Sequence, residues 1–287
     1  MFYGVCAVVV ALAAAHFPRD FDHASTANPW LTRADYASFY DALYIGGAAE
    51  SAGPSGSAAS SVPAFVNRYQ LQRSRVLEVG AGRGELQDVV ADYTGLDISG
   101  SARPYFHKPF VEASATEMPF STGRFDAIWT VNTLEHVPKP EQALAEMRRV
   151  LKDGGLLYLE AAWQCRPWAA NGYHVRPYAD LDVRGKLVKA SVPLRESVAF
   201  RVLYTFPIRI TRWATSVVTG AAMTFRYRRL DPNYVHYWDA DSDAANSMDA
   251  YEAILWFTSR GDELLSFEGA VHPLFVRSGA LVIRVRK

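Results

Sequence analysis

The stretch VLEVGAGRG, Val76–Gly84, ends an apolar run in three glycines at alternate positions, and the acid Glu78 lies just upstream of them. A glycine-rich turn between a strand and a helix lets the backbone approach a ligand closely and points the first amides of the helix at it. The residue types therefore predict a ligand-binding turn, and the spacing indicates the kind of ligand.

Two common nucleotide-binding turns do not fit this spacing. A dinucleotide fingerprint that starts at Gly80 requires its third glycine where this chain has Glu85, and a P-loop requires Gly-Lys followed by Ser or Thr, which is absent. Glu85 at the start of a helix would also repel a pyrophosphate. The turn is therefore predicted to bind a cationic or zwitterionic ligand.

Further motifs follow the turn in a fixed order. They are GLDIS, which contains the acid Asp97, and then EASATEMPF, FDAIWTVNTLEHV and MRRVLKDGGLLYLE. Together with VLEVGAGRG, this series resembles the class I S-adenosylmethionine-dependent methyltransferases, in particular their small-molecule branch. The resemblance covers about Pro63–Trp163 and resumes from Ser247 to the end. It implies S-adenosylmethionine as the cofactor and methyl transfer as the activity.

The resemblance also implies roles for single residues. Glu78 would steady the glycine loop and the ammonium end of the cofactor, Asp97 would accept both ribose hydroxyls, and Asn132 would touch the methionine end. The other implied cofactor contacts are Gly80, Ala81, Gly82 and Gly84 under the methionine part, Ile98 on the adenine, and Ser114, Ala115 and Thr116 at the adenine edge. Relatives often have Asp at the position of Ser114, so the backbone amide of Ala115 would serve there instead.

Methyl transfer from a sulfonium is an in-line displacement from an activated leaving group, so neither a catalytic triad nor a metal is expected. An oxygen nucleophile also needs a base, and histidine suits that task near neutral pH. The candidates are His174 and His236, in segments rich in Tyr, Trp and Arg that suit a sugar or aromatic substrate, and His136 in LEHV. A purely structural role stays open for all three.

The positioning elements follow from alternating strand and helix patterns. These predict an α/β, doubly wound, Rossmann-like and mostly parallel sheet with an antiparallel last strand and a lid insertion after the fifth strand. The predicted helices are Pro29–Tyr44, a short helix from Pro63, one that ends at Gly154 and Gly155, and one capped by Ser247.

Four parts follow along the chain. Residues 1–61 are predicted as an apolar segment, a helix and a flexible linker (Gly46–Ser61), 62–163 as the cofactor-binding core, 164–246 as a substrate lid, and 247–287 as the end of the core with its last two strands.

Charge is balanced overall but not locally. Thirty basic and thirty acidic residues give no net charge, which argues against a nucleic-acid partner. From Arg184 to Leu230 ten basic residues face one acid, whereas Asp231–Glu268 holds nine acids and one Arg. The basic stretch is also apolar, so two interpretations stand side by side. It contacts a membrane surface through Arg201, Arg209 and Arg212, or it pairs with the acidic segment and covers the pocket.

The compartment is indicated by two features. Cys6 and Cys165 show neither a disulfide framework nor a zinc spacing, which fits a reducing compartment. The first 17 residues contain no charged side chain and lack the basic start of a secretory signal, so export is not expected and weak membrane contact stays open. The prediction is a cytoplasmic protein, or one that is peripheral at the inner face of a membrane.

The sequence thus predicts a methyltransferase that acts on the oxygen of a glycan, glycolipid or other small molecule, lipid-linked acceptors included. A catalytically silent cofactor-binding scaffold and, further off, a nicotinamide oxidoreductase are the alternatives. No oligomeric state is predicted.

Overall fold

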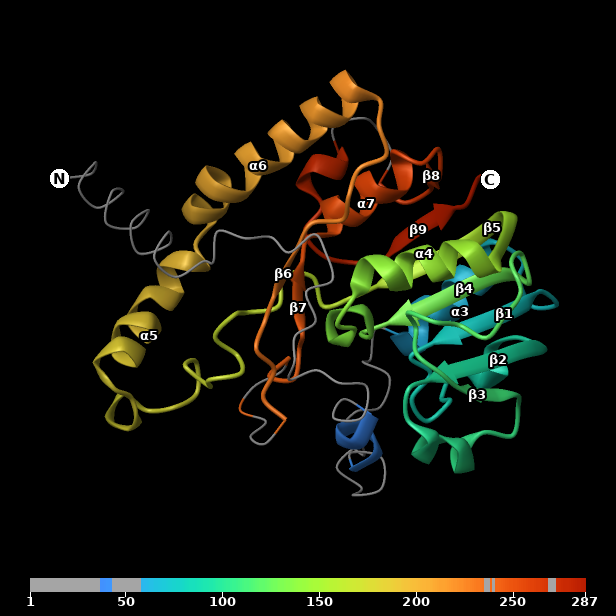
Figure 1. The fold of residues 1–287 in the computed structure, drawn as a ribbon, viewed down its shortest axis with the longest axis horizontal. Coiled ribbons are helices and arrows are strands. Elements are labelled where there is room, and N and C mark those ends of the chain that lie inside the picture. The colour runs from blue at the N-terminus through green and yellow to red at the C-terminus, as the bar shows by residue number, and fades with distance from the viewer. Residues whose placement is uncertain (1–36, 43–57, 235–237, 239–240, 268–271) are drawn as a thin grey trace.

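The computed structural model describes residues 37–42, 58–234, 238, 241–267 and 272–287. Within them, a seven-stranded sheet has the order β3-β2-β1-β4-β5-β9-β8 (Figure 1). Its strands are β1 (Arg75–Val79), β2 (Asp92–Asp97), β3 (Phe110–Glu112), β4 (Phe125–Val131), β5 (Leu151–Glu160), β8 (Glu263–Leu264) and β9 (Leu281–Arg284). Strands β1 to β5 pair in parallel, and β9 is antiparallel to β5 and β8. The predicted fold class is confirmed.

Helices cover both faces of the sheet because its strands alternate their side chains between two apolar cores. Val76, Tyr93 and Trp129 pack with α3 (Ala58–Arg68), while Leu77 and Ile128 pack on the opposite face. That second core also takes the apolar residues of α4 (Pro140–Val150) and α7 (Ala250–Thr258). The buried residues of α4 are Ala143, Leu144, Met147 and Val150, as its 3.6-residue period predicts.

Two predicted helix boundaries are wrong. Helix α4 ends at Val150, and Gly154 and Gly155 lie inside β5, where they pair with Val285 next to the terminal strand. Helix α7 is capped by Asp249, whose side chain accepts the amide of Tyr251, while Ser247 belongs to a strand. In both places strand pairing across the chain overrides the local stop or cap residue.

The glycine turn leads into no α-helix. Only a three-residue 3₁₀ turn, Gln87–Val89, separates it from β2, because the chain has just Gly84–Ala91 before that strand begins. The prediction that helix amides point at the ligand from this turn is therefore wrong. Glu85 is an exposed residue and not the mouth of a helix, so its repulsion of a pyrophosphate no longer distinguishes ligands.

The amino-terminal predictions are only partly within the described residues. Residues 37–42 are helical, in keeping with part of the predicted helix Pro29–Tyr44. The apolar start and most of the predicted linker lie outside the described residues. The linker prediction is wrong at its end, because α3 already begins at Ala58.

The segment between β5 and α7 forms an arm along one side of the sheet domain (Figure 1). It contains α5 (Val183–Arg195), α6 (Val198–Thr219) and the antiparallel strands β6 (Tyr227–Arg229) and β7 (Asn246–Met248). Further 3₁₀ turns lie at Gly100–Tyr105, Leu134–His136 (η4), Tyr178–Asp180 and His272–Phe275 (η6). None of the described helices is long and apolar enough to span a bilayer.

Two ion pairs, one buried and one half-buried, attach the arm to α7. Arg209 meets the carboxylate of Asp249 with nitrogen–oxygen distances of 2.6 and 2.9 Å, and Arg212 meets Glu252 at 2.8 and 2.9 Å. Both arginines are buried, so neither can reach lipid headgroups. The membrane role predicted for Arg209 and Arg212 is therefore wrong, and pairing with the acidic segment is what these two residues do. The side chain of Arg201 lies outside the described residues.

Glu78 is a buried carboxyl group beneath the glycine turn. The hydroxyl of Tyr93 donates a short hydrogen bond to its Oε2 atom. Burial raises the pKa of Glu78 to about 8, although the Tyr93 hydrogen bond acts in the opposite direction. Glu78 is therefore largely protonated at neutral pH in the folded protein.

We expect Arg212→Leu to lower the free energy of unfolding by about 3 to 5 kcal/mol, because it leaves the Glu252 carboxylate buried without its cation. Arg212→Leu combined with Glu252→Leu should recover part of this loss. Urea unfolding checks both, with the exposed Arg184→Gln as a control that stays within about 0.5 kcal/mol of wild type. A single variant as stable as wild type would contradict the buried pair.

Glu78→Gln should change the pH dependence of stability. A carboxyl whose folded pKa lies above its unfolded value stabilises the fold fully below the unfolded pKa and loses that contribution as pH rises through the folded pKa. Wild type should therefore lose stability relative to Glu78→Gln between pH 4.5 and about pH 8. Thermal melts across this range test the expectation, and parallel curves for the two proteins would refute it.

Candidate functional site

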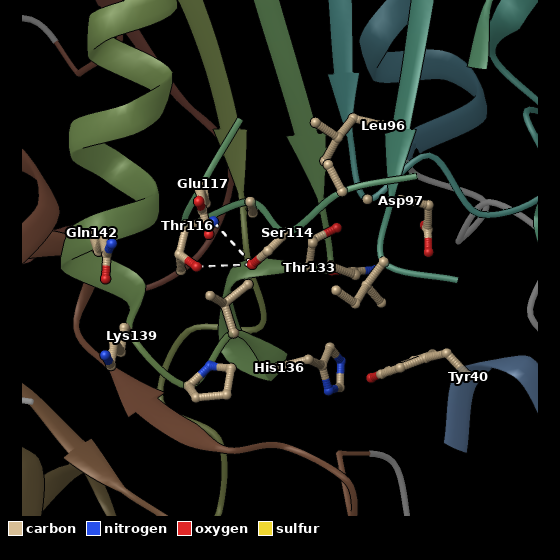
Figure 2. A pocket seen from close by; sticks show the side chains of 17 residues that line it. Tyr40, Leu96, Asp97, Ser114, Thr116, Glu117, Thr133, His136, Lys139 and Gln142 are labelled. Carbon is tan, nitrogen blue, oxygen red and sulfur yellow. Dashed lines mark hydrogen bonds between the residues drawn. The ribbon is translucent and has the colours of Figure 1, made fainter. Parts of the chain in front are cut away.

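A pocket of about 410 Å³ opens at the carboxyl ends of β1, β2 and β4 (Figure 2). This is the edge where open parallel sheets bind ligands, and the volume lies in the range of small-molecule sites. It is lined by Tyr40, Gly80, Leu96, Asp97, Ile98, Ala113, Ser114, Ala115, Thr116, Glu117, Asn132, Thr133, His136, Val137, Pro138, Lys139 and Gln142. Seven of the predicted cofactor residues and one predicted base are among them.

Asp97 ends β2 and is almost fully buried at the pocket wall. Its Oδ2 atom accepts the amide of Gly82 at 2.9 Å, and Oδ1 accepts the amide of Ser99 at 3.0 Å. Burial raises the pKa of Asp97, and these backbone hydrogen bonds counteract that rise. Each carboxylate oxygen has a second lone pair. The fixed side chain can therefore still accept hydrogen bonds from two hydroxyl groups.

The glycine turn is shaped mainly by its packing against side chains. Gly80, Gly82 and Gly84 all have positive φ angles, of 73°, 51° and 69°. A Cβ on Gly80 would lie 2.1 Å from Oγ1 of Thr133, and one on Gly84 would lie 2.7 Å from the ring of Phe106. Of the predicted turn residues only Gly80 lines the pocket, while Ala81, Gly82 and Gly84 support it from outside.

The segment Ser114–Thr116 forms the opposite wall of the pocket. The hydroxyls of Ser114 and Thr116 lie 2.8 Å apart, and the amide of Thr116 donates to Ser114 Oγ at 3.2 Å (Figure 2). Ser114 thus stabilises the local turn, as a short polar side chain commonly does. Ala115 lines the pocket between them, where its backbone was predicted to act.

Asn132 follows β4 with a φ of 47°, and its amide donates to the carbonyl of Glu160 on β5. This left-handed position turns the chain into η4 and places Asn132 and Thr133 on the pocket wall. Glu78 does not line the pocket. Its buried pairing with Tyr93 places it behind the turn, and its predicted contact with the cofactor ammonium stays a prediction.

His136 lies at the far end of the pocket among carboxylates. Its Nδ1 atom is 3.2 Å from Oδ2 of Asp243, and its Nε2 atom is 3.8 Å from Oε1 of Glu135. The hydroxyl of Tyr40 donates to the same Asp243 oxygen at 2.9 Å, and Figure 2 shows Tyr40 and His136 facing each other. Burial lowers the pKa of His136, but Asp243 and Glu135 outweigh it and hold this pKa above its usual value.

The other two predicted bases are not brought to this pocket. His174 lies in the arm, partly exposed, 3.7 Å from Glu196, and does not line the pocket. His236 lies outside the described residues.

Several residues that form the site are not among those predicted from the sequence. Tyr40, Thr133 and Asp243 reach the pocket or its base from three separate segments. The acidic run that ends at Asp243 and the position of Thr133 directly after Asn132 are signals that could have indicated two of them. Nothing in the predicted helix that contains Tyr40 distinguishes that tyrosine from its aromatic neighbours.

The comparison with known proteins gives a consistent result. Residues 77–159 match the family model described as a methyltransferase domain. A ubiquinone/menaquinone biosynthesis C-methyltransferase, UbiE of Sinorhizobium fredii, is 33% identical over 144 residues, which are 44% of this chain and 56% of that protein. The ubiquinone biosynthesis O-methyltransferase of Dechloromonas aromatica is 35% identical over 31% of this chain and 44% of its own length.

The chain thus spans about half the length of these curated relatives. The solved structure of BH2331 from Bacillus halodurans C-125, provisionally assigned to the methyltransferases, covers 79% of this chain and 100% of that one at 16% identity, with a TM-score of 0.44. The sheet order, the motif positions and the matched family model agree, and residues 77–159 form a methyltransferase domain similar to those of the class I S-adenosylmethionine-dependent methyltransferases.

Proposed function

We propose that this chain transfers the methyl group of S-adenosylmethionine to a hydroxyl of a small-molecule acceptor, with His136 as the general base. One observation carries the proposal. The pocket that contains the family's cofactor segments, including Asp97 and Ser114–Thr116, also contains a histidine held by a carboxylate. A cofactor-binding end and a proton-accepting end therefore share one cavity.

The residues of the pocket fit the cofactor. Asp97 is fixed by two amides and retains lone pairs for the ribose hydroxyls, and Ile98 offers an apolar wall for the adenine. Ala115 and Asn132 line the same cavity. When bound, the cofactor supplies a methyl group activated by a sulfonium, so the protein has chiefly to align the acceptor and exclude water.

His136 suits the role of base because its surroundings fix the ring and its charge state. Asp243 holds Nδ1, which leaves Nε2 as the atom that accepts a proton. The carboxylates of Asp243 and Glu135 stabilise the imidazolium that results. Tyr40 donates a hydrogen bond to Asp243 and so positions the carboxylate that holds His136.

The acceptor class follows from the same chemistry. The relatives reported above are named for C- and O-methylation, and we favour transfer to oxygen here because a hydroxyl gives His136 a proton to remove. Glycan, glycolipid and lipid-linked acceptors stay predictions within this class. Incubating the protein and methyl-labelled cofactor with cell extract, followed by mass spectrometry, tests the function, and the absence of any labelled small molecule would count against it.

The silent-scaffold alternative makes a different prediction for the same assay. A scaffold would bind the cofactor and leave every small molecule unlabelled. The intact glycine turn and Asp97 allow binding in either case, so the His136–Asp243 pair is the feature that favours an enzyme.

For the cofactor, we expect Asp97→Ala to weaken binding of S-adenosylhomocysteine by about 1.5 to 3 kcal/mol, the scale of hydrogen bonds to a charged group. Titration calorimetry measures this. Asp92→Ala, at the exposed start of the same strand, serves as the control and should leave affinity unchanged. Unchanged affinity in a folded Asp97→Ala protein, or tighter binding of NADH or ATP, would overturn the assignment.

For the base, His136→Gln should lower turnover by about a hundredfold while cofactor affinity stays intact. The base acts in its neutral form, so activity should fall as pH drops through the raised pKa of His136. Asp243→Asn removes the first carboxylate that raises this pKa and should move the acid limb of the pH profile to lower pH. His174→Gln is the matched control, and equal losses in the two histidine variants would refute the role of His136.

A further inference from the structure

Helix α6 exposes an apolar stripe on the surface of the protein. Leu203, Ile210, Trp213 and Val217 repeat at intervals of seven, three and four residues and so lie on one face, and they are 69%, 40%, 47% and 65% exposed. Arg209 and Arg212 lie beside this stripe, on the side of the helix that is buried. The helix is thus held by its charged side and presents its apolar side outward.

The apolar surface continues onto a segment that is distant in sequence. Phe206 of α6 packs against Phe275 of η6 with ring centroids 5.2 Å apart, and Phe275 is 60% exposed. Between the two elements lies a cleft of about 240 Å³, lined by four apolar side chains and by Gln164, Thr205, Arg209 and Arg277. We call the stripe and this cleft together the α6 surface.

The charge on this surface has one sign. Helix α6 contains no Asp or Glu, and the residues that line the cleft include none either. Arg277 is exposed at the cleft, whereas Arg209 forms an ion pair with Asp249. A partner that binds here would therefore contact apolar side chains, with the Arg277 cation at their edge.

We propose that the α6 surface docks on the surface of a lipid bilayer that carries anionic headgroups. A long helix with one apolar face and an exposed Trp is suited to lie in the bilayer interface, and Arg277 complements an anionic headgroup. The apolar cleft beside it has room for part of an acyl chain. Insertion of apolar side chains drives this docking, and headgroup contacts of Arg209 and Arg212 play no part in it. The docking proposal does not depend on the proposed reaction.

Vesicle sedimentation of the full chain tests the proposal. The vesicles contain phosphatidylcholine alone or mixed with phosphatidylglycerol. The α6 surface variant is Leu203→Asp with Trp213→Asp, and the control is Thr211→Asp with Thr215→Asp, which adds the same charge to exposed positions of the same helix. Circular dichroism and binding of S-adenosylhomocysteine establish that each variant is folded.

We expect wild type and the control to sediment with the anionic vesicles and the surface variant to lose about tenfold or more in partitioning. Wild type should also retain most of its binding at high salt, since salt weakens headgroup attraction more than apolar insertion. Wild type that stays in the supernatant with both vesicle types overturns the proposal, and so do equal losses in both variants. A wild-type dimer that the surface variant converts to monomer, without vesicle binding, would assign the surface to a second copy of the chain.

Discussion

Parallel pairing of β1 with β2 on one side and β4 on the other is the constraint on which the site depends. The registers Val79 to Leu96 and Glu78 to Trp129 bring the ends of three strands level at one edge of the sheet. Gly80, Asp97 and Asn132 each follow or end one of those strands, so they meet although they are far apart in the chain. The amide of Gly82 on Asp97 then ties the first strand's turn to the end of the second.

The features that could be predicted from the sequence are those determined by residues close together in the chain. Short apolar runs that alternate with helical patterns, together with the glycine turn, predicted the sheet and one side of the pocket, because these signals depend on neighbouring residues. The helix expected after Gly84 does not form, since chain length before β2 decides it and the motif does not contain that information. Caps and stops at Ser247 and Gly154 were overridden by strand partners distant in sequence.

The end of the pocket that contains His136 was harder to predict for a related reason. Tyr40 and Asp243 are 203 positions apart, and their hydrogen bond exists only once the arm returns to the core. Segment charges left pairing of the basic and acidic regions open as one of two interpretations, and only the packed α6 and α7 determine which carboxylate each arginine meets. Residues that act through such contacts have no sequence period by which to recognise them.

The η4 turn has a consequence for how such a chain can diverge. Oε1 of Glu135 accepts the amide of Ala162 where the arm leaves the sheet, and the carbonyl of Glu135 accepts the amide of Ala245 where the arm returns. Asn246 donates to Val137 beside them at 2.5 Å. Both ends of the arm are thus fixed to one short turn, and the parts of the arm that do not pair with the core can change in length and composition while the pocket wall keeps its shape. Acceptor preference can then evolve by changes in those parts alone, because the contacts of Arg209, Arg212 and Asp243 keep the arm in place.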